Sequence, residues 1–427
     1  MKRITFILTI LLVKNAAANN TPVHNAFTTN SHNTRASRGV GARPLGDPGI
    51  PGLSATAGVG MPSNFVRAAS PRSSSFLTFA GSVTPRMVNF NHPKSPARES
   101  AAQKGTFRIG QPSRQQTIPD ASIIDTTWPS ADLSSGPLHA RFYLPNAATG
   151  YYRSTRFDWS GVMPSLEYKG HTFFGQWFPK YDPTLNDAIM GPVESFTPIG
   201  YDQAQPGGPF LQLGVGILTR PDTSRYTPFK YYPIQNPGYW NITKIAGAIA
   251  FRQDLNAAGY SYVYIKTITF TPGQPQMVIT HTLKNTGSQP LESDVYDHNF
   301  FVIDTQTVAP GRVLKLPWTP TASDARGLGE LADIRGDSIV FLQTFAPRQS
   351  VYAILHGYGD KPADYDIRIE EHRTGAGVRI RCDRPLAKLA FWASIKTACP
   401  EPFIHIKAAP GETITWTLTY DFYVLTP

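Results

Sequence analysis

Short runs in which apolar and polar residues alternate fill the chain from about residue 120 to its end. Gly, Pro, Asn and Asp separate these runs, and none has the 3.6-residue period of an amphipathic helix. Alternation with a period of two is typical of β-strands that bury one face. The pattern predicts about fifteen strands, at residues 139–144, 151–157, 162–168, 210–219, 243–253, 261–270, 276–284, 293–303, 338–344, 351–355, 366–371, 377–382, 388–395, 403–406 and 413–423.

The connections between these runs favour an antiparallel arrangement. Residues 285–287 and 374–377 have the composition of hairpin turns, and no convincing helix separates consecutive strands. With aromatic residues at 12%, charged residues at 16% and 73 Gly or Pro (35 and 38), the composition also favours strands over helices. We therefore expect one all-β domain over residues 120–427, a large antiparallel β-sandwich rather than βαβ units.

The first 119 residues have a different texture. Residues 1–19 begin with Met1-Lys2-Arg3, continue with an apolar run of about ten residues and end in small residues, which predicts a signal peptide and export to a periplasm or the cell exterior. The apolar run is too short for an integral membrane span. Residues 20–119 contain scattered apolar positions among Ser, Thr, Asn, Pro, Gly and Arg, which predicts a disordered basic segment.

The net charge of +10 is confined to this N-terminal part. Residues 1–119 hold fourteen Lys or Arg and two acidic residues, a net +12, so residues 120–427 carry −2. The folded domain therefore lacks the net positive charge that favours nucleic-acid binding, and we do not expect it to bind nucleic acid.

Cofactor motifs are missing from the sequence. It has no phosphate-cradling glycine loop, no HExxH and no calcium-loop spacing of acids, so we expect neither cofactor nor metal. Cys382 and Cys399 are too few for a disulfide scaffold; two buried free thiols or a single bridge both fit.

One strong strand is interrupted by polar residues at Asp297, His298 and Asn299. With a period of two, His298 shares a face with Tyr296 and Phe300, whereas Asp297 and Asn299 point the other way. Partial desolvation on an aromatic face would keep the imidazole proton mobile near neutral pH. A satisfied core histidine is the structural alternative.

A second candidate is Glu401, which lies between Pro400 and Pro402. Each proline restricts the backbone, so the carboxylate is held rigidly beside two strands. Rigid placement is what a general base requires. An ordinary loop glutamate is the alternative.

Residues 151–201 add a mixture of aromatic, basic and acidic side chains. Aromatic faces stack on sugar rings while Arg, Glu and His bond to hydroxyl groups, so the mixture indicates a sugar or oligosaccharide as the partner. Each of these side chains also has an ordinary structural interpretation. The candidates for substrate binding are Arg153, Arg156, His171, Trp177, Glu194 and, from the later strand, Asn299, with Arg373 as a weaker one.

Three short motifs carry a resemblance. The strand 297–301 (Asp-His-Asn-Phe-Phe), the Glu401-Pro402 pair and the turn 410–413 (Pro-Gly-Glu-Thr) before the last strand together resemble the galactose mutarotase, or aldose 1-epimerase, superfamily. The resemblance implies a β-supersandwich with a concave sugar-binding face over about residues 135–425.

The resemblance also implies roles. His298 would protonate the ring oxygen of an aldose and Glu401 would take the proton of the anomeric hydroxyl, so that the ring opens and closes again as either anomer. Arg153 or Arg156 would orient the sugar, and His171 would be a further contact. Two alternatives stay open: a non-catalytic sugar-binding module, and a polysaccharide lyase or hydrolase on the same fold, in which Glu194 and Glu401 would supply two carboxylates.

Overall fold

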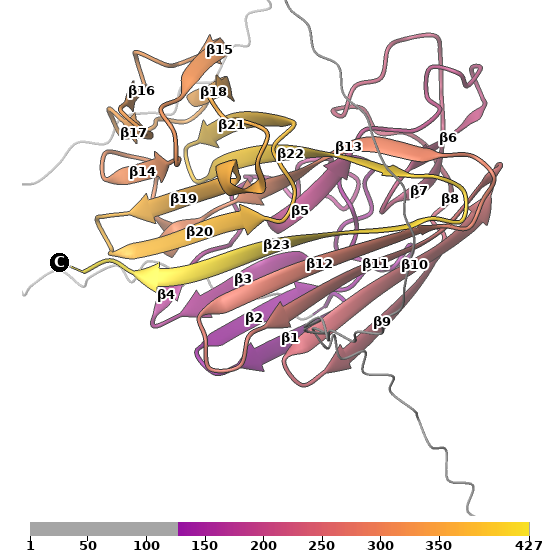
Figure 1. Ribbon diagram of the computed structural model, residues 1–427, viewed down its shortest axis with the longest axis horizontal. Helices are drawn as coiled ribbons and strands as arrows, with labels where there is room; N and C mark the ends of the chain where they lie inside the picture. The colour runs from indigo at the N-terminus through magenta and orange to yellow at the C-terminus, as the bar shows by residue number, and fades with distance from the viewer. Residues whose placement is uncertain (1–126, 427) are drawn as a thin grey trace, which may run out of the picture. The chain divides into compact units, whose positions relative to one another are not determined.

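The computed structural model describes residues 127–426, in which the regular secondary structure is almost entirely β-strand (Figure 1). The expected signal peptide, the expected disordered segment 20–119 and the expected boundary near residue 120 lie outside the described residues. Four sheets form, and the strands that pair within them run antiparallel. The predicted fold class, a large antiparallel β-sandwich, is confirmed.

The largest sheet has ten strands. In spatial order they are β16 (Ala332–Arg335), β17 (Ser338–Phe341), β14 (Arg312–Lys315), β19 (Asp366–Glu371), β20 (Ala376–Cys382), β23 (Thr413–Val424), β12 (Gln276–Asn285), β11 (Tyr260–Phe270), β10 (Ala248–Ala257) and β9 (Tyr239–Ile245).

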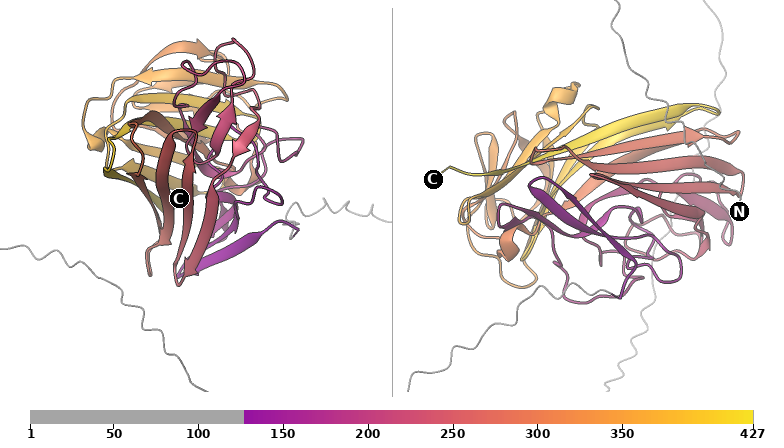
Figure 2. Two further views of the ribbon diagram at one scale, coloured as in Figure 1. Left: turned by 90° about the vertical axis from the view of Figure 1, so that its right-hand side faces the viewer. Right: turned by 90° about the horizontal axis from the view of Figure 1, so that it is seen from below.

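A six-stranded sheet packs against one part of it, and two small sheets complete the fold (Figures 1 and 2). The six strands are β15 (Thr321–Arg326), β18 (Ser350–His356), β21 (Lys388–Ser394), β22 (Ala398–Ala408), β13 (Leu291–Phe300) and β5 (Gly191–Phe196). The small sheets are β1 (Ser130–Ser135), β2 (Leu138–Tyr143), β3 (Val162–Tyr168) and β4 (His171–Thr172), then β6 (Pro209–Gln212), β7 (Gly216–Thr219) and β8 (Ile234–Asn236). Two 3-10 turns, η1 (Ile303–Thr305) and η2 (Pro362–Asp364), lie in connections.

The main core lies between the two large sheets because their strands alternate apolar and polar positions. In β11 burial alternates at nearly every residue, and Tyr264 and Ile268 are fully buried. Opposite them, Val295 of β13 and Leu389 of β21 belong to the same apolar cluster. Each buried side chain of this size stabilises the fold by about 1.5–3 kcal/mol, which gives the alternating strands their register.

A second, separate cluster packs on the other side of the six-stranded sheet. It joins Phe300 of β13 to aromatic side chains of the loops between β2 and β3 and between β7 and β8, among them Tyr152, Phe157 and Tyr232. These loops cover the outer face of the six-stranded sheet.

Several strand predictions differ from the structure. Residues 151–157 form a buried loop, because their aromatic side chains pack into the second cluster while the backbone bonds to other loops, as when Arg153 N–H donates to Pro183 O. Residues 243–253 are two strands, since Gly247, with φ of 73°, turns the chain between β9 and β10. The turn at 374–377 joins β19 to β20 as predicted, whereas the turn at 285–287 leads from β12 into the other large sheet.

Cys382 and Cys399 are buried and unpaired. Within residues 127–426, no helix is long and apolar enough to cross a membrane.

Candidate functional site

β13 and β22 place two titratable side chains next to each other on one face of the six-stranded sheet. Tyr296 pairs with Phe403, and the same antiparallel register sets His298 opposite Glu401. Directly opposed residues point to the same side of a sheet. Nε2 of His298 accordingly lies 3.3 Å from Oε1 of Glu401.

This pair lines a cavity of about 430 Å³ on the sheet face away from the main core. The volume falls in the range of about 300–1,000 Å³ that is usual for small-molecule sites. Aromatic rings and a few charged groups make the walls. The lining residues are Arg156, Trp177, Asp187, Phe229, His298, Phe300, Arg326, Tyr352, Trp392 and Glu401.

His298 is held among aromatic rings. Its imidazole stacks on Phe300 at a centroid distance of 3.9 Å, and Phe157 meets it edge-on at 5.5 Å. Burial, and secondarily the nearby charge of Arg156, keep the pKa of His298 well below its usual value. The imidazole is therefore neutral at pH 7, and its Nδ1 has no hydrogen-bond partner among residues 127–426.

The pKa of Glu401 is shifted in the opposite direction, upward from its usual value. Only 8% of the residue is exposed, and this burial raises its pKa to about 7, against the smaller lowering effects of Arg156 and Lys388. The carboxyl is therefore partly protonated near neutral pH. With His298 neutral, the pair holds one transferable proton and one basic nitrogen within 3.3 Å of each other.

Arg156 enters the cavity from the loop that the sequence analysis predicted as a strand. Its Nη2 and Nε donate to the hydroxyl oxygen of Tyr296 at 3.0 and 3.3 Å, and its Nη1 donates to Asp187. Its guanidinium also lies over the rings of Phe157 and Phe229, 4.6 and 4.9 Å from their centroids. The cation is thereby fixed in place beside His298 and Glu401.

Trp177 forms part of the aromatic wall. Its ring stacks on Phe300 at 5.0 Å and meets Trp392 edge-on at 5.3 Å, while Nε1 donates to the carbonyl of Ile189 at 3.0 Å. The hydrogen bond fixes the ring plane, and such planar apolar surfaces suit the face of a sugar ring.

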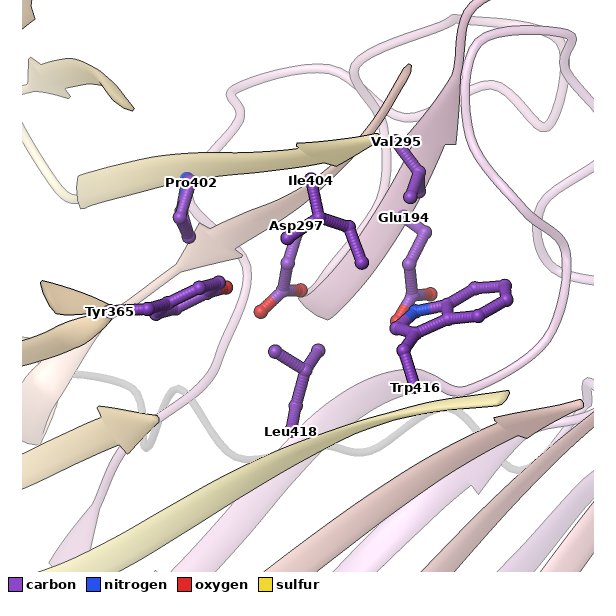
Figure 3. Close-up of a pocket in the computed structure, with 8 residues that line it drawn as sticks. All are labelled: Glu194, Val295, Asp297, Tyr365, Pro402, Ile404, Trp416 and Leu418. Carbon is purple, nitrogen blue, oxygen red and sulfur yellow. The ribbon is translucent and has the colours of Figure 1, made fainter. Parts of the chain in front are cut away.

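Glu194 lies elsewhere, although the sequence placed it among the candidate ligands. It pairs with Asp297 in β5 and β13, so it points to the face opposite His298, into the interior between the large sheets. Figure 3 shows Glu194 and Asp297 there, beside Trp416 and Leu418 of β23. Burial would raise the pKa of Glu194, but ion pairs with Lys266 and His281 outweigh it and lower the pKa to about 2. Glu194 is a buried structural anion and does not face Glu401 across the cavity.

Three other candidates are also absent from the cavity lining. Arg153 donates to the carbonyl of Ala148, and His171 Nδ1 lies 2.9 Å from a carboxylate oxygen of Asp304 in η1. Asn299 faces the interior and donates to the carbonyls of Asp297 and Pro400. Each therefore has a structural partner, and of the two arginines that the sequence left open, Arg156 reaches the cavity.

No family model and no curated protein matches the chain. Solved structures that are similar to it include many aldose 1-epimerase or galactose mutarotase-like proteins. A galactose mutarotase related enzyme from Lactobacillus acidophilus is 10% identical, with a TM-score of 0.44 over 70% of this chain and 98% of that one. A GalM/aldose epimerase homologue from C. elegans is 13% identical, with a TM-score of 0.43 over 70% and 99%. A putative aldose 1-epimerase from Escherichia coli K12 is 13% identical, with a TM-score of 0.41 over 69% and 99%.

These similarities come from the superfamily that the three sequence motifs indicated. They are similarities of fold and not of activity.

The sequence analysis missed several lining residues. Phe300 could have been included, since it shares the face of His298 two positions away. Asp187, Phe229, Arg326 and Tyr352 had no local signal, because strand pairing and loop packing bring them to the cavity from separate parts of the chain.

Proposed function

We propose that this protein binds an aldose in the cavity and interconverts its anomers by acid–base opening of the sugar ring. The observation that carries the proposal is the contact of His298 with Glu401 at 3.3 Å, inside a cavity of about 430 Å³ that Trp177 lines with a flat aromatic face. The pair, the cation of Arg156 and the aromatic wall supply proton transfer, orientation and stacking.

The reaction needs two proton transfers, one at each of the two oxygens that are bonded to C1 of the sugar. Glu401, when protonated, gives its proton to the ring oxygen, and Nε2 of His298 takes the proton of the anomeric hydroxyl while the bond between C1 and the ring oxygen breaks. Both sugar oxygens are bonded to C1, so two protein atoms 3.3 Å apart can reach them together. Rotation of the aldehyde and closure on its other face return both protons and give the second anomer.

The pKa directions support this assignment of roles. The resemblance implied His298 as the acid that opens the ring, but an imidazole with a pKa well below its usual value carries no spare proton at pH 7. Glu401, with a pKa of about 7, does. Ring closure runs through the same groups in exchanged roles, and each transfer contributes about 10²–10⁴-fold by general acid–base catalysis.

A non-catalytic sugar-binding module would use the same walls without proton transfer. A hydrolase on the Glu194 and Glu401 pair is not supported, because the two carboxylates lie on opposite faces of the six-stranded sheet.

Polarimetry of freshly dissolved α-aldoses tests the proposal. We expect the full chain to accelerate the approach to anomeric equilibrium for at least one sugar in a panel that includes glucose and galactose, and H298A and E401Q to lose that acceleration. R153Q is the matched control, because Arg153 was an equal candidate by sequence and lies outside the cavity lining. Absence of acceleration over the whole panel would leave the binding module as the better interpretation.

A further inference from the structure

A row of side chains crosses the floor of the cavity from strand to strand. Arg326 of β15 pairs with Tyr352 of β18, and Tyr352 pairs with Trp392 of β21. Glu401 of β22 and His298 of β13 occupy the next two strands of the same sheet. All five line the one cavity. Between β21 and β22 the row shifts by two residues along the strands, because Trp392 pairs with Cys399 and Glu401 with Ala390.

The row is longer than one sugar ring. Neighbouring strands lie about 4.8 Å apart, so the four steps from β13 to β15 span roughly 19 Å. A single pyranose in contact with His298 and Glu401 cannot span that length. The part of the row beyond Trp392 would then face solvent alone.

The chemistry of that outer part suits further sugar residues. Tyr352 is half-buried, and the guanidinium of Arg326 lies 5.2 Å from the centroid of its ring. The side chain of Arg326 is exposed and makes no hydrogen bond or ion pair with another described residue, so its donors can reach hydroxyl groups. An aromatic face beside a guanidinium repeats the pairing of Trp177 with Arg156 around the reacting pair, with the difference that the donors of Arg156 already bond to Tyr296 and Asp187.

The cavity lining also contains an exposed aromatic side chain. Phe229 is 70% exposed although it lines the cavity and contacts the guanidinium of Arg156. An aromatic side chain in a cavity lining, exposed to solvent, is available to contact a bound ligand.

We propose that the cavity takes an oligosaccharide, with the reducing-end sugar at His298 and Glu401 and the following sugars along Trp392, Tyr352 and Arg326. The placement of the reducing end rests on the proposed function. The length of the row and its aromatic and donor groups do not depend on the proposed function.

Binding by isothermal calorimetry tests the inference separately from turnover. The probes are glucose and galactose with their di- and trisaccharides, namely the maltose, cellobiose and β-1,4-galactobiose series, titrated into the full chain carrying H298A. Proton transfer is then removed while the outer row is kept. We expect the affinity in at least one series to rise tenfold or more from monosaccharide to trisaccharide.

Variants of the outer row show which side chains raise the affinity for longer saccharides. Y352A and R326A, each in the H298A chain, should lower trisaccharide affinity by a larger factor than monosaccharide affinity. Y239A removes an exposed tyrosine on β9 of the other large sheet, outside the cavity lining, and should change neither. Affinity that does not rise with chain length in any series, absence of binding included, overturns the inference, and so does a rise that persists undiminished in Y352A. A rise with chain length in a protein without polarimetric activity would refute the proposed function and keep the inference.

Discussion

The guanidinium of Arg156 donates two hydrogen bonds to the hydroxyl oxygen of Tyr296, which ties a loop residue to the strand that carries His298. Its positive charge lowers the pKa of both His298 and Glu401. Arg156 thus acts on the pair electrostatically as well as by position.

Replacement of this arginine should therefore move both ends of the pH profile. In R156Q the pKa values of His298 and Glu401 rise, so both limbs of kcat/KM against pH shift to higher pH. KM should also rise roughly tenfold, which corresponds to a loss of about 1.4 kcal/mol of binding free energy. The measurement is polarimetric rate against pH, with R153Q in parallel. A lower activity with unshifted limbs would show that the charge of Arg156 does not act on the pair.

The wild-type profile follows from the same two groups. The pair is active while Glu401 is protonated and His298 is neutral. Activity should fall as the pH rises through about 7, where Glu401 loses its proton, and should hold on the acid side until His298 protonates well below its usual pKa. Buffer-corrected kcat/KM between pH 4 and 9 checks this. Activity that increases through pH 7 would contradict the assignment of Glu401 as the acid.

E401Q should gain stability where it loses activity. The pKa of Glu401 is raised by burial from 4.5 to about 7, so the folded state holds a proton that the unfolded state has released, and stability falls as the pH rises between these values. At pH 8 the wild type has lost roughly 3 kcal/mol from this group, and Gln does not ionise. Urea unfolding of both proteins at pH 4.5 and 8 measures the difference in stability between E401Q and the wild type. The other titrating groups are the same in both proteins, so they do not contribute to this difference.

The expected sign is specific. E401Q should exceed the wild type in stability by more at pH 8 than at pH 4.5. An equal difference at the two pH values would show that Glu401 titrates normally in the folded protein.

β11, which buries one face, was predictable from sequence, and β5, which buries both faces, was not. β11 was found because its burial alternates at nearly every residue. β5 was missed because all six of its residues are buried and it begins with Gly191 and Pro192, so it shows no alternation. Because β5 was not predicted, the sequence also did not indicate to which face of the sheet Glu194 points. The pairing of Glu194 with Asp297 shows that face.

The candidate pair was predictable, whereas its surroundings were not. His298 and Glu401 each have local signals, a polar break in an aromatic strand and two flanking prolines. Arg153 and Arg156 are three positions apart in one loop, and nothing local distinguishes them. The row from Trp392 to Arg326 requires β18 to pair with β21 while β19 and β20 join the other sheet, a non-local choice that residue pattern does not encode.

The last prediction concerns the interior cation that holds Glu194. Lys266 is fully buried, forms an ion pair with Glu194 and donates to the carbonyl of Ser160 at 3.1 Å. In K266M this contact is lost while the carboxylate stays buried, and breaking a buried pair in this way costs about 3–5 kcal/mol. K230M is the matched control, because Lys230 pairs with Asp222 at 2.7 Å on the surface, where an ion pair contributes little.

Urea unfolding at pH 7 compares these variants. The double variant E194Q/K266M should lose less stability than the two single variants together, because the neutral amide that replaces the carboxylate leaves no uncompensated charge in the interior. A K266M midpoint as close to the wild type as that of K230M would mean that the interior pair does not hold the two large sheets together. We expect the opposite, a clear loss of stability in K266M, because Glu194 contacts both Lys266 and His281 in the interior.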